Sequence, residues 1–231
     1  MIKQAIIPLA GLGTRLLPLT SVFAKELLPI NGKPGIEYIL DECIEAGIKE
    51  VIFIISKKKL MIKKYFYNDK FYKEIIKRKN DPRIISEYQK ILRYKKMIKF
   101  VFQDKPLGTG DAILKTKKLI KDKYFLMLLP DDLIIKKNCS KSMISIHKKF
   151  NSSVMASMKV NKNEVSRWGI YNVKKKIDNM NFIIKSVVEK PTPKKAPSNN
   201  AVIGRYILPK TIFKKLFNLK PSKGGEIHIT D

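Results

Sequence analysis

A glycine-rich turn near the N-terminus has the composition of a phosphate-binding loop. Apolar residues 6–9 lead into Gly11-Leu12-Gly13-Thr14-Arg15. Glycines let backbone N–H groups approach phosphate oxygens, and Arg15 adds a charge-assisted donor. Neither common phosphate loop is matched, because Leu16 stands where a dinucleotide fingerprint has its third glycine and no Gly-Lys-Ser/Thr follows. The residues alone therefore indicate either a phosphate loop or an ordinary connection between a strand and a helix.

An acidic pair follows another apolar run in the middle of the chain. Asp131-Asp132 comes after residues 125–129, all of which are apolar. Carboxylate oxygens are the ligands that Mg²⁺ prefers, and α/β sheets place ligands at the carboxyl ends of their strands. The pair equally fits a turn after a strand. Which of the two it forms depends on the fold around it.

The spacing of apolar residues predicts the elements that would position these turns. Apolar runs of strand length at 3–9, 50–55, 98–103 and 124–129 alternate with helical patterns. One helix begins near Pro34 and ends near Gly47, and residues 57–96 form a helical excursion interrupted at 80–82. Such alternation is typical of parallel strands joined by crossover helices. We therefore expect an α/β fold with a mostly parallel, Rossmann-like mixed sheet flanked by helices.

The pattern changes after residue 149. Shorter β-like segments lie at 154–160, 169–173, 182–188 and 201–207, separated by turns rich in proline and asparagine. They predict an extension of the same sheet, so that residues 1–231 form a single domain. The last six residues, 226–231, have the pattern of a lead-in to a further helix, with Thr230 or Asp231 as its N-cap.

The charge of the chain first suggests a nucleic-acid binder. Among 231 residues, 48 Lys+Arg face 20 Asp+Glu, for a net charge of +28. Only 6 of the 48 basic residues are arginine, the residue that clamps phosphates and reads guanine edges, and the lysines are scattered along the whole chain. We interpret the charge as a solvated surface that attracts anions and predict no specific nucleic-acid partner; a basic nucleic-acid-binding protein is the alternative.

Cysteine usage and hydropathy limit the compartment. Two cysteines, Cys43 and Cys139, make neither a disulfide framework nor a four-ligand zinc site, and a reducing compartment suits them. No apolar run approaches the ~20 residues that a membrane-spanning helix needs. We expect a cytoplasmic protein without a membrane partner. His147 and His228 lie far apart in the sequence without the spacing of metal ligands, and we expect surface or packing roles for them. Cys43 falls on the apolar face of the first helix, where we expect it in the core.

Together with the first turn, several blocks resemble the signature of the sugar-phosphate nucleotidylyltransferases, in particular their uridylyl branch. Residues 23–34 carry Lys25 just before Glu26-Leu27-Leu28-Pro29. Further matching blocks follow in the family's order and cover essentially the whole chain, at residues 103–112, 129–132, 168–170, 188–191, 197–199, 203–206 and 225–231. The resemblance implies the nucleotide-diphospho-sugar transferase type of the α/β fold.

The resemblance implies roles for residues on the nucleotide side. Residues matching nucleotide contacts are Ala10, Gly11, Gly13, Thr14, Gln103 and Gly108. Gln103 can pair with an imide N–H and a carbonyl, and Gly108 leaves room for a flat base. Arg15 and Lys25 match catalytic cations that screen the repulsion between two anionic substrates. Read without the family, Lys25 could instead be a surface lysine.

The resemblance assigns the sugar side and the metal to the second half of the chain. Gly169 and Glu189 match groups that face the sugar, Lys190 matches a catalytic partner of its phosphate, and Asp131 matches the family's magnesium-binding aspartate. Read alone, Glu189-Lys190 before Pro191 is an exposed pair at a strand edge. Trp168 either walls the sugar pocket or simply packs.

The activity implied by the resemblance joins UTP and α-D-glucose 1-phosphate into UDP-glucose and pyrophosphate, with Mg²⁺ as cofactor. Alternatives are a sister enzyme that uses dTTP and a catalytically impaired regulatory paralogue. Retention of Thr14, Arg15 and Lys25 speaks against the paralogue. In the family the chain continues past the position of Asp231 into a segment with a second metal-binding aspartate and with helices that make subunit contacts. We therefore expect a fragment or a shortened enzyme, and the family's homo-oligomer is in doubt for this chain.

Overall fold

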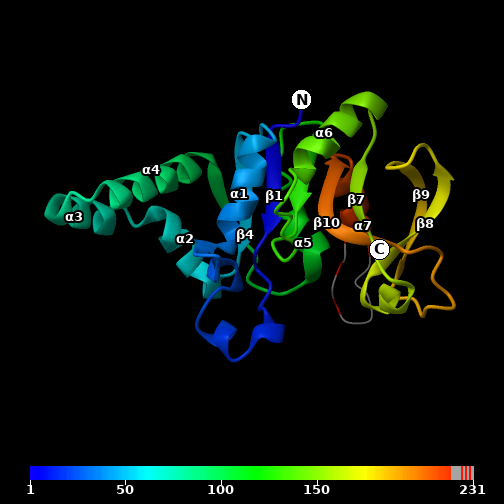
Figure 1. Ribbon diagram of the computed structural model, residues 1–231, viewed down its shortest axis with the longest axis horizontal. Coiled ribbons are helices and arrows are strands. Elements are labelled where there is room, and N and C mark those ends of the chain that lie inside the picture. The colour runs from blue at the N-terminus through cyan, green and yellow to red at the C-terminus, as the bar shows by residue number, and fades with distance from the viewer. Residues whose placement is uncertain (220–224, 226, 228, 230–231) are drawn as a thin grey trace.

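The computed structural model describes residues 1–219, 225, 227 and 229, and its centre is a large mixed sheet (Figure 1). Eight strands form this sheet, in the order β5-β4-β1-β6-β10-β8-β9, with β7 paired to β10. Their bounds are β1 Gln4–Pro8, β4 Glu50–Ile55, β5 Ile98–Phe102, β6 Tyr124–Leu128, β7 Val154–Lys159, β8 Gly169–Lys176, β9 Phe182–Glu189 and β10 Asn200–Pro209. Every strand predicted from the sequence is present within a few residues.

Strand direction divides the sheet into two halves. The pairs β1 with β4, β4 with β5 and β1 with β6 are parallel. Strand β10 runs antiparallel to β6, β7 and β8, and β8 runs antiparallel to β9. The expected mixed sheet flanked by helices is confirmed, but it is not mostly parallel: three pairings, all in its N-terminal half, are parallel, and the other four are antiparallel. The C-terminal strands extend the same sheet, as the sequence predicts.

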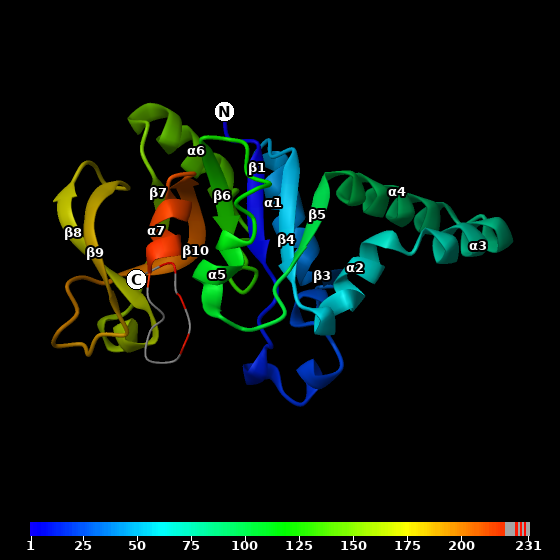
Figure 2. The same cartoon turned by 180° about the vertical axis from the view of Figure 1, so that it is seen from behind.

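Helices cover both faces of the sheet (Figures 1 and 2). Their bounds are α1 Gly35–Glu45, α2 Leu60–Tyr67, α3 Asp69–Lys79, α4 Pro82–Met97, α5 Gly108–Leu114, α6 Cys139–Phe150 and α7 Ile212–Asn218. Strand β4 shows how the faces are shared, because successive side chains of a strand point to opposite sides. Phe53 packs in the core formed with α1, α2, α4 and α6, whereas its neighbours Ile52 and Ile54 pack in the core formed with α5 and α7.

The predicted helical excursion at 57–96 is an arm that extends away from the sheet, at the left in Figure 1. It consists of α2, α3 and α4. Asn80 ends α3 in the left-handed conformation, with φ of 47°. Asp81 then caps α4 by accepting a hydrogen bond from the Arg83 N–H at 2.8 Å, and Pro82 occupies the first turn. The interruption predicted at 80–82 is confirmed. No helix in the described part of the chain is long and apolar enough to cross a membrane.

Some elements were not predicted. Helix α6 begins at an Asn138 cap, whose Oδ1 accepts from the Lys141 N–H at 2.7 Å. Residues 29–34 form a small hairpin of β2 Pro29–Ile30 and β3 Lys33–Pro34, whose Asn31-Gly32 turn has both φ angles positive. These signals were in the sequence, since an asparagine cap and an Asn-Gly turn are local. The helix expected after residues 226–231 lies outside the described residues.

Candidate active site

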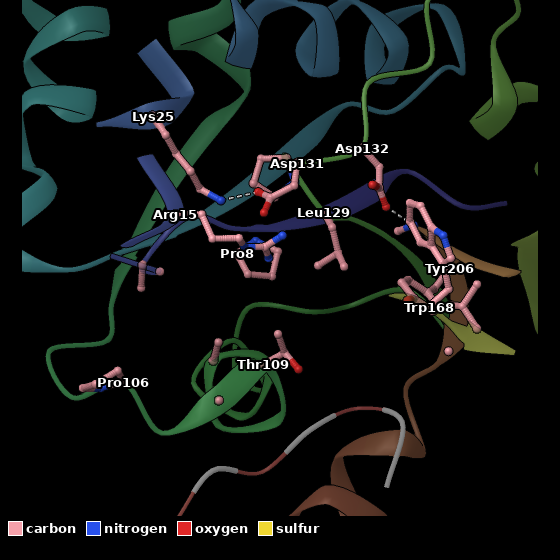
Figure 3. A pocket seen from close by; sticks show the side chains of 18 of the residues that line it. Pro8, Arg15, Lys25, Pro106, Thr109, Leu129, Asp131, Asp132, Trp168 and Tyr206 are labelled. Carbon is pink, nitrogen blue, oxygen red and sulfur yellow. Dashed lines mark hydrogen bonds and ion pairs between the residues drawn. The ribbon is translucent and has the colours of Figure 1, made fainter. Parts of the chain in front are cut away.

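A cavity of about 710 Å³ lies where β1, β6 and β9 end, beside the start of β8 and the middle of β10. Ligands of α/β sheets bind at this edge. Ten of the twelve predicted site residues line the cavity: Ala10, Gly11, Arg15, Lys25, Gln103, Gly108, Asp131, Gly169, Glu189 and Lys190. Figure 3 shows Arg15, Lys25 and Asp131 on one side of the cavity and Trp168 and Tyr206 on the other. The structure thus brings together residues from both halves of the chain.

Gly13 and Thr14 do not line the cavity. Gly13 is left-handed, with φ of 70°, and its carbonyl accepts the Thr20 hydroxyl at 2.9 Å. A Cβ at this position would lie 3.3 Å from Cδ of Lys25. Gly13 therefore shapes the loop and leaves room for the Lys25 side chain. Thr14 begins a 3-10 turn and is exposed.

Lys25 and Asp131 are paired at one side of the cavity. Its Nζ forms a hydrogen-bonded ion pair with Oδ1 of Asp131, drawn as a dashed line in Figure 3. The Lys25 side chain is 20% exposed and that of Asp131 49%, so the pair is open to an incoming ligand. The ammonium group of such a pair can instead bind a substrate phosphate, and the carboxylate can instead bind a metal ion.

A buried ion pair anchors the turn that carries Lys25. Glu26 follows Lys25 in the 3-10 turn Lys25–Leu27, and both of its carboxylate oxygens accept from Lys59 Nζ, at 2.7 and 2.8 Å. Burial lowers the pKa of Lys59, and the Glu26 carboxylate opposes that shift. Because Lys59 follows the end of β4, this pair ties the Lys25 turn to the sheet.

Gln103 directly follows β5, and its buried side chain is held by hydrogen bonds to other residues of the chain. Its Nε2 donates to the Gly108 carbonyl at 3.1 Å and to Oδ2 of Asp111 at 2.8 Å. Gly108 has φ of 90°, and a Cβ there would lie 2.4 Å from the Ile227 carbonyl oxygen. The amide nitrogen is thus used in shaping the loop, which leaves Oε1 as the Gln103 atom able to face a base N–H.

Gly169 and Glu189 are paired across β8 and β9. A Cβ at Gly169 would lie 3.0 Å from Oε2 of Glu189, so the carboxylate lies over the glycine. Lys190 then takes the left-handed conformation, with φ of 44°, and its N–H donates to the Trp168 carbonyl at 3.0 Å. Adjacent residues of a regular strand point to opposite faces, and the change in backbone direction lets Glu189 and Lys190 line one cavity.

Several lining residues were not predicted as site residues. Tyr206 is buried at the cavity wall, and burial together with the carboxylates of Asp132 and Glu189 raises its pKa to about 12. Its hydroxyl therefore keeps its proton at neutral pH. Asp132 is turned away from Asp131, and its Oδ2 accepts from the Gly204 N–H at 2.6 Å. Trp168 lines the cavity and also packs against a small core behind it.

Residues for which no site role was expected behave accordingly. Cys43 is fully buried in the core under α1. His147 packs against Tyr124, and its Nδ1 lies 2.7 Å from the Ser152 carbonyl oxygen. The packing roles predicted for these two residues are confirmed, and His228 lies outside the described residues.

Within the described residues, no three His, Cys, Asp or Glu side chains come together as a metal cluster. Asp131 presents a half-exposed carboxylate to the cavity beside Lys25, Oδ2 of Asp132 is bound to the Gly204 N–H, and the exposed carboxylate of Glu189 lies over Gly169. Mg²⁺ is often held by one or two carboxylates together with substrate phosphates and water. The donor set fits such a shared site and does not fit a cage built from these protein residues alone.

Comparisons with known proteins identify the family to which this chain belongs. The model of the family described as nucleotidyl transferase matches residues 4–231. A UTP–glucose-1-phosphate uridylyltransferase of Streptococcus pyogenes is 36% identical, over all of this chain and 77% of that protein, and one of Bacillus subtilis is 34% identical over the same shares. A crystal structure of UDP-glucose pyrophosphorylase with UDP-glucose has a TM-score of 0.86 and 37% identity, over all of this chain and 85% of that one. The resemblance seen in the sequence is confirmed, and the chain belongs to the nucleotidyl transferase family.

Proposed function

We propose that this enzyme transfers the uridylyl group of UTP to α-D-glucose 1-phosphate, forming UDP-glucose and pyrophosphate. The observation that carries the proposal is the cavity, which gathers the cations Arg15, Lys25 and Lys190 together with the exposed carboxylates of Asp131 and Glu189. Two polyanions can meet only where cations offset their repulsion. The names of the similar proteins from Streptococcus and Bacillus support this choice of substrates.

The nucleotide would bind in the N-terminal half of the cavity. Backbone N–H groups of the loop at Ala10 and Gly11 would meet the phosphates, together with Arg15. The base would lie near Gln103 and Gly108, with Oε1 of Gln103 accepting from the uracil N–H. Gly13 and Thr14 would act by shaping this loop and not by direct contact. The UTP-bound structure of UGPase from Acinetobacter baumannii is similar to this chain. The two sequences are 33% identical, and the structures have a TM-score of 0.86 over 94% of this chain and 78% of that one.

The sugar phosphate would bind in the C-terminal half. The Glu189 carboxylate can accept hydrogen bonds from two neighbouring hydroxyls, and the absence of a side chain at Gly169 leaves space for it. Lys190 would hold the phosphate of the sugar. Because Glu189 and Lys190 are consecutive, one turn of the chain would fix both the sugar ring and its phosphate.

A divalent metal, which we propose to be Mg²⁺, would be held by Asp131 together with the nucleotide phosphates. It would stabilise negative charge on the reacting phosphate. A phosphate oxygen of the sugar phosphate would attack the α-phosphorus of UTP in line, and the bond to the bridging oxygen of the pyrophosphate would break. Lys25 would move from Asp131 to the phosphates, and Arg15 and Lys190 would hold the two substrates in the orientation for attack.

The deciding experiment measures pyrophosphate release by the purified 231-residue chain. The complete reaction contains Mg²⁺, UTP and glucose 1-phosphate, and matched reactions omit one component or replace UTP by dTTP. We expect release that depends on all three components and is faster with UTP. A faster rate with dTTP would overturn the nucleotide assignment, and release without glucose 1-phosphate would overturn the transfer reaction.

Location and assembly are further parts of the proposal. Two free cysteines, of which Cys43 is buried, fit a reducing compartment, and we propose the cytoplasm. No membrane or specific nucleic-acid partner is proposed. The homo-oligomer implied by the resemblance stays a prediction, which light scattering of the purified chain would test.

A further inference from the structure

An ion pair is buried behind the cavity, outside the residues assigned to substrates. Glu42 lies on α1 and Arg205 on β10, and both are buried, Arg205 completely. Arg205 Nε donates to both oxygens of Glu42 at 3.1 Å, and Nη2 donates to Oε2 at 2.8 Å. Ser140 also donates to Oε1 of Glu42, through its N–H at 3.1 Å and its hydroxyl at 2.5 Å. The carboxylate is therefore held from two sides.

The rest of the guanidinium binds the turn after β6. Nη1 donates to the carbonyls of Leu129 and Gly204, at 3.1 and 3.0 Å, and Nη2 donates to the carbonyl of Asp132 at 2.7 Å. These bonds and those to Glu42 use all five N–H groups of Arg205. Two of the three carbonyls lie immediately before Pro130 and immediately after Asp131. Arg205 therefore grips both ends of the short turn from which the Asp131 side chain projects.

Strand β10 holds the same turn through its backbone. The Gly204 N–H donates to Oδ2 of Asp132 at 2.6 Å, and the Leu129 N–H donates to the Gly204 carbonyl at 2.8 Å. A Cβ at Gly204 would lie 2.4 Å from Cβ of Leu129, so the strand and the turn are in the closest contact that a glycine allows. Of the two aspartates of this turn, Asp132 is bound to Gly204, and Asp131 is the one paired with Lys25, as Figure 3 shows.

Stability alone does not explain this arrangement. A buried ion pair is often no more stabilising than apolar side chains of the same volume, because both charges lose their hydration. The pair instead fixes the orientation of Arg205. Its guanidinium is a rigid plane whose donors have fixed angles, and the Glu42 carboxylate sets the orientation of that plane. Groups that orient a metal ligand without touching the metal commonly change affinity or activity 10–100-fold when they are removed.

We propose that Arg205, oriented by Glu42, is a positioning residue that sets the Asp131 carboxylate toward the metal ion and the nucleotide phosphates. The proposal rests on the proposed function, because it takes Asp131 as the metal ligand. It assigns a functional effect to two side chains that touch neither substrate nor metal. It also gives β10 a role in the metal site, through a side chain that lies entirely beneath the cavity floor.

The test compares two glutamates of the same helix. Glu42→Gln removes the charge that orients Arg205 and keeps the shape of the side chain. Glu37→Gln is the matched control, because Glu37 is also a buried carboxylate on α1 that is paired with a lysine, Lys90, but does not contact the turn. Arg205→Lys is the second test variant, since a lysine keeps the charge and cannot reach the carboxylate and three carbonyls at once.

Folding of each variant is checked first by circular dichroism and thermal unfolding. Mn²⁺ binding is then followed by electron paramagnetic resonance, with the enzyme saturated with UTP. We expect Glu42→Gln and Arg205→Lys to weaken Mn²⁺ binding about tenfold or more and to lower kcat similarly, with the KM for glucose 1-phosphate changed less than about twofold. Glu37→Gln should lose stability and keep both values.

Three outcomes keep the proposals apart. If the wild-type chain shows no UTP- and metal-dependent activity, the proposed function fails and the positioning role fails with it. If the wild type is active and the folded Glu42→Gln protein binds Mn²⁺ as tightly as Glu37→Gln, the positioning role alone is overturned. If Arg205→Lys does not fold, Glu42→Gln decides, and its comparison with Glu37→Gln separates positioning from a general loss of stability.

Discussion

The buried pair of Glu26 and Lys59 gives the clearest quantitative prediction. Their side chains are 1% and 7% exposed, and both carboxylate oxygens are bound to the ammonium group. Lys59→Met keeps the length of the side chain and removes its charge, so that the Glu26 carboxylate is left without a counter-charge in the interior. Removing one partner of such a pair lowers the free energy of unfolding by about 3–5 kcal/mol.

The expected change in melting temperature follows from the size of the chain. One kcal/mol corresponds to about 2–4 °C for 150–250 residues, so Lys59→Met should lower Tm by about 6–20 °C. The double variant Glu26→Gln with Lys59→Met leaves no uncompensated charge. It should therefore be more stable than Lys59→Met alone, although it contains one more substitution.

Urea unfolding and thermal unfolding, both followed by circular dichroism, would measure these differences. Lys57→Met is the control, because Lys57 is 79% exposed and its Nζ lies 3.5 Å from Asp104 at the surface. It should change Tm by no more than the error of the measurement. The reasoning would be refuted by a Lys59→Met protein within about 1 kcal/mol of wild type, or by a double variant less stable than the single one.

Three further predictions concern the cavity and its supports. Lys25→Ala should lower turnover by orders of magnitude and leave the circular dichroism spectrum unchanged, and a near-normal rate of pyrophosphate release would contradict the role of Lys25. Gly204→Ala should lower the free energy of unfolding in urea by about 1–3 kcal/mol, because its Cβ would lie 2.4 Å from Cβ of Leu129; wild-type stability would show that the turn can move aside. Removing divalent metal with EDTA should abolish activity, and adding Mg²⁺ should restore it. Tm should stay unchanged, because no acidic cluster among the described residues holds a metal as part of the fold. A large drop in Tm would reveal a structural metal.

The N-terminal half of the sheet could be predicted because its strands have the pattern of buried parallel strands. Strand β4 was predicted at its observed bounds. Its five consecutive apolar residues, 51–55, are typical of a strand that is buried on both faces, and all five are buried. The break at Asn80-Asp81-Pro82 was equally local, since a left-handed asparagine, a capping aspartate and a proline all act within one turn. The mixed direction of the sheet was harder, because the pairing of β10 with β6 joins segments about 80 residues apart.

The site was predicted mainly through the resemblance to a family and less through the residues themselves. Patterns alone left the glycine turn and Asp131-Asp132 open to ordinary structural readings. The sequence did not show that Gly13 supports the loop from behind, because that depends on its contact with Thr20 and Lys25. Arg205 was one residue of a matching block, and nothing in its neighbourhood indicated that it would be buried. Its partner Glu42 is 163 residues away, and only the packing of α1 against the sheet brings the two together.

The position of β10 in the sheet has a consequence for synthesis. The edge of β6 that lies next to β10 consists of apolar residues, and β10 leaves the ribosome after the other seven strands described for this sheet. Until residues 200–209 emerge, a nascent chain would expose that edge and could pair with another chain. The same strand that protects the edge brings Gly204 and Arg205 to the turn of Asp131. The turn of Asp131 and the protection of this edge should therefore form in one step, when β10 takes its place.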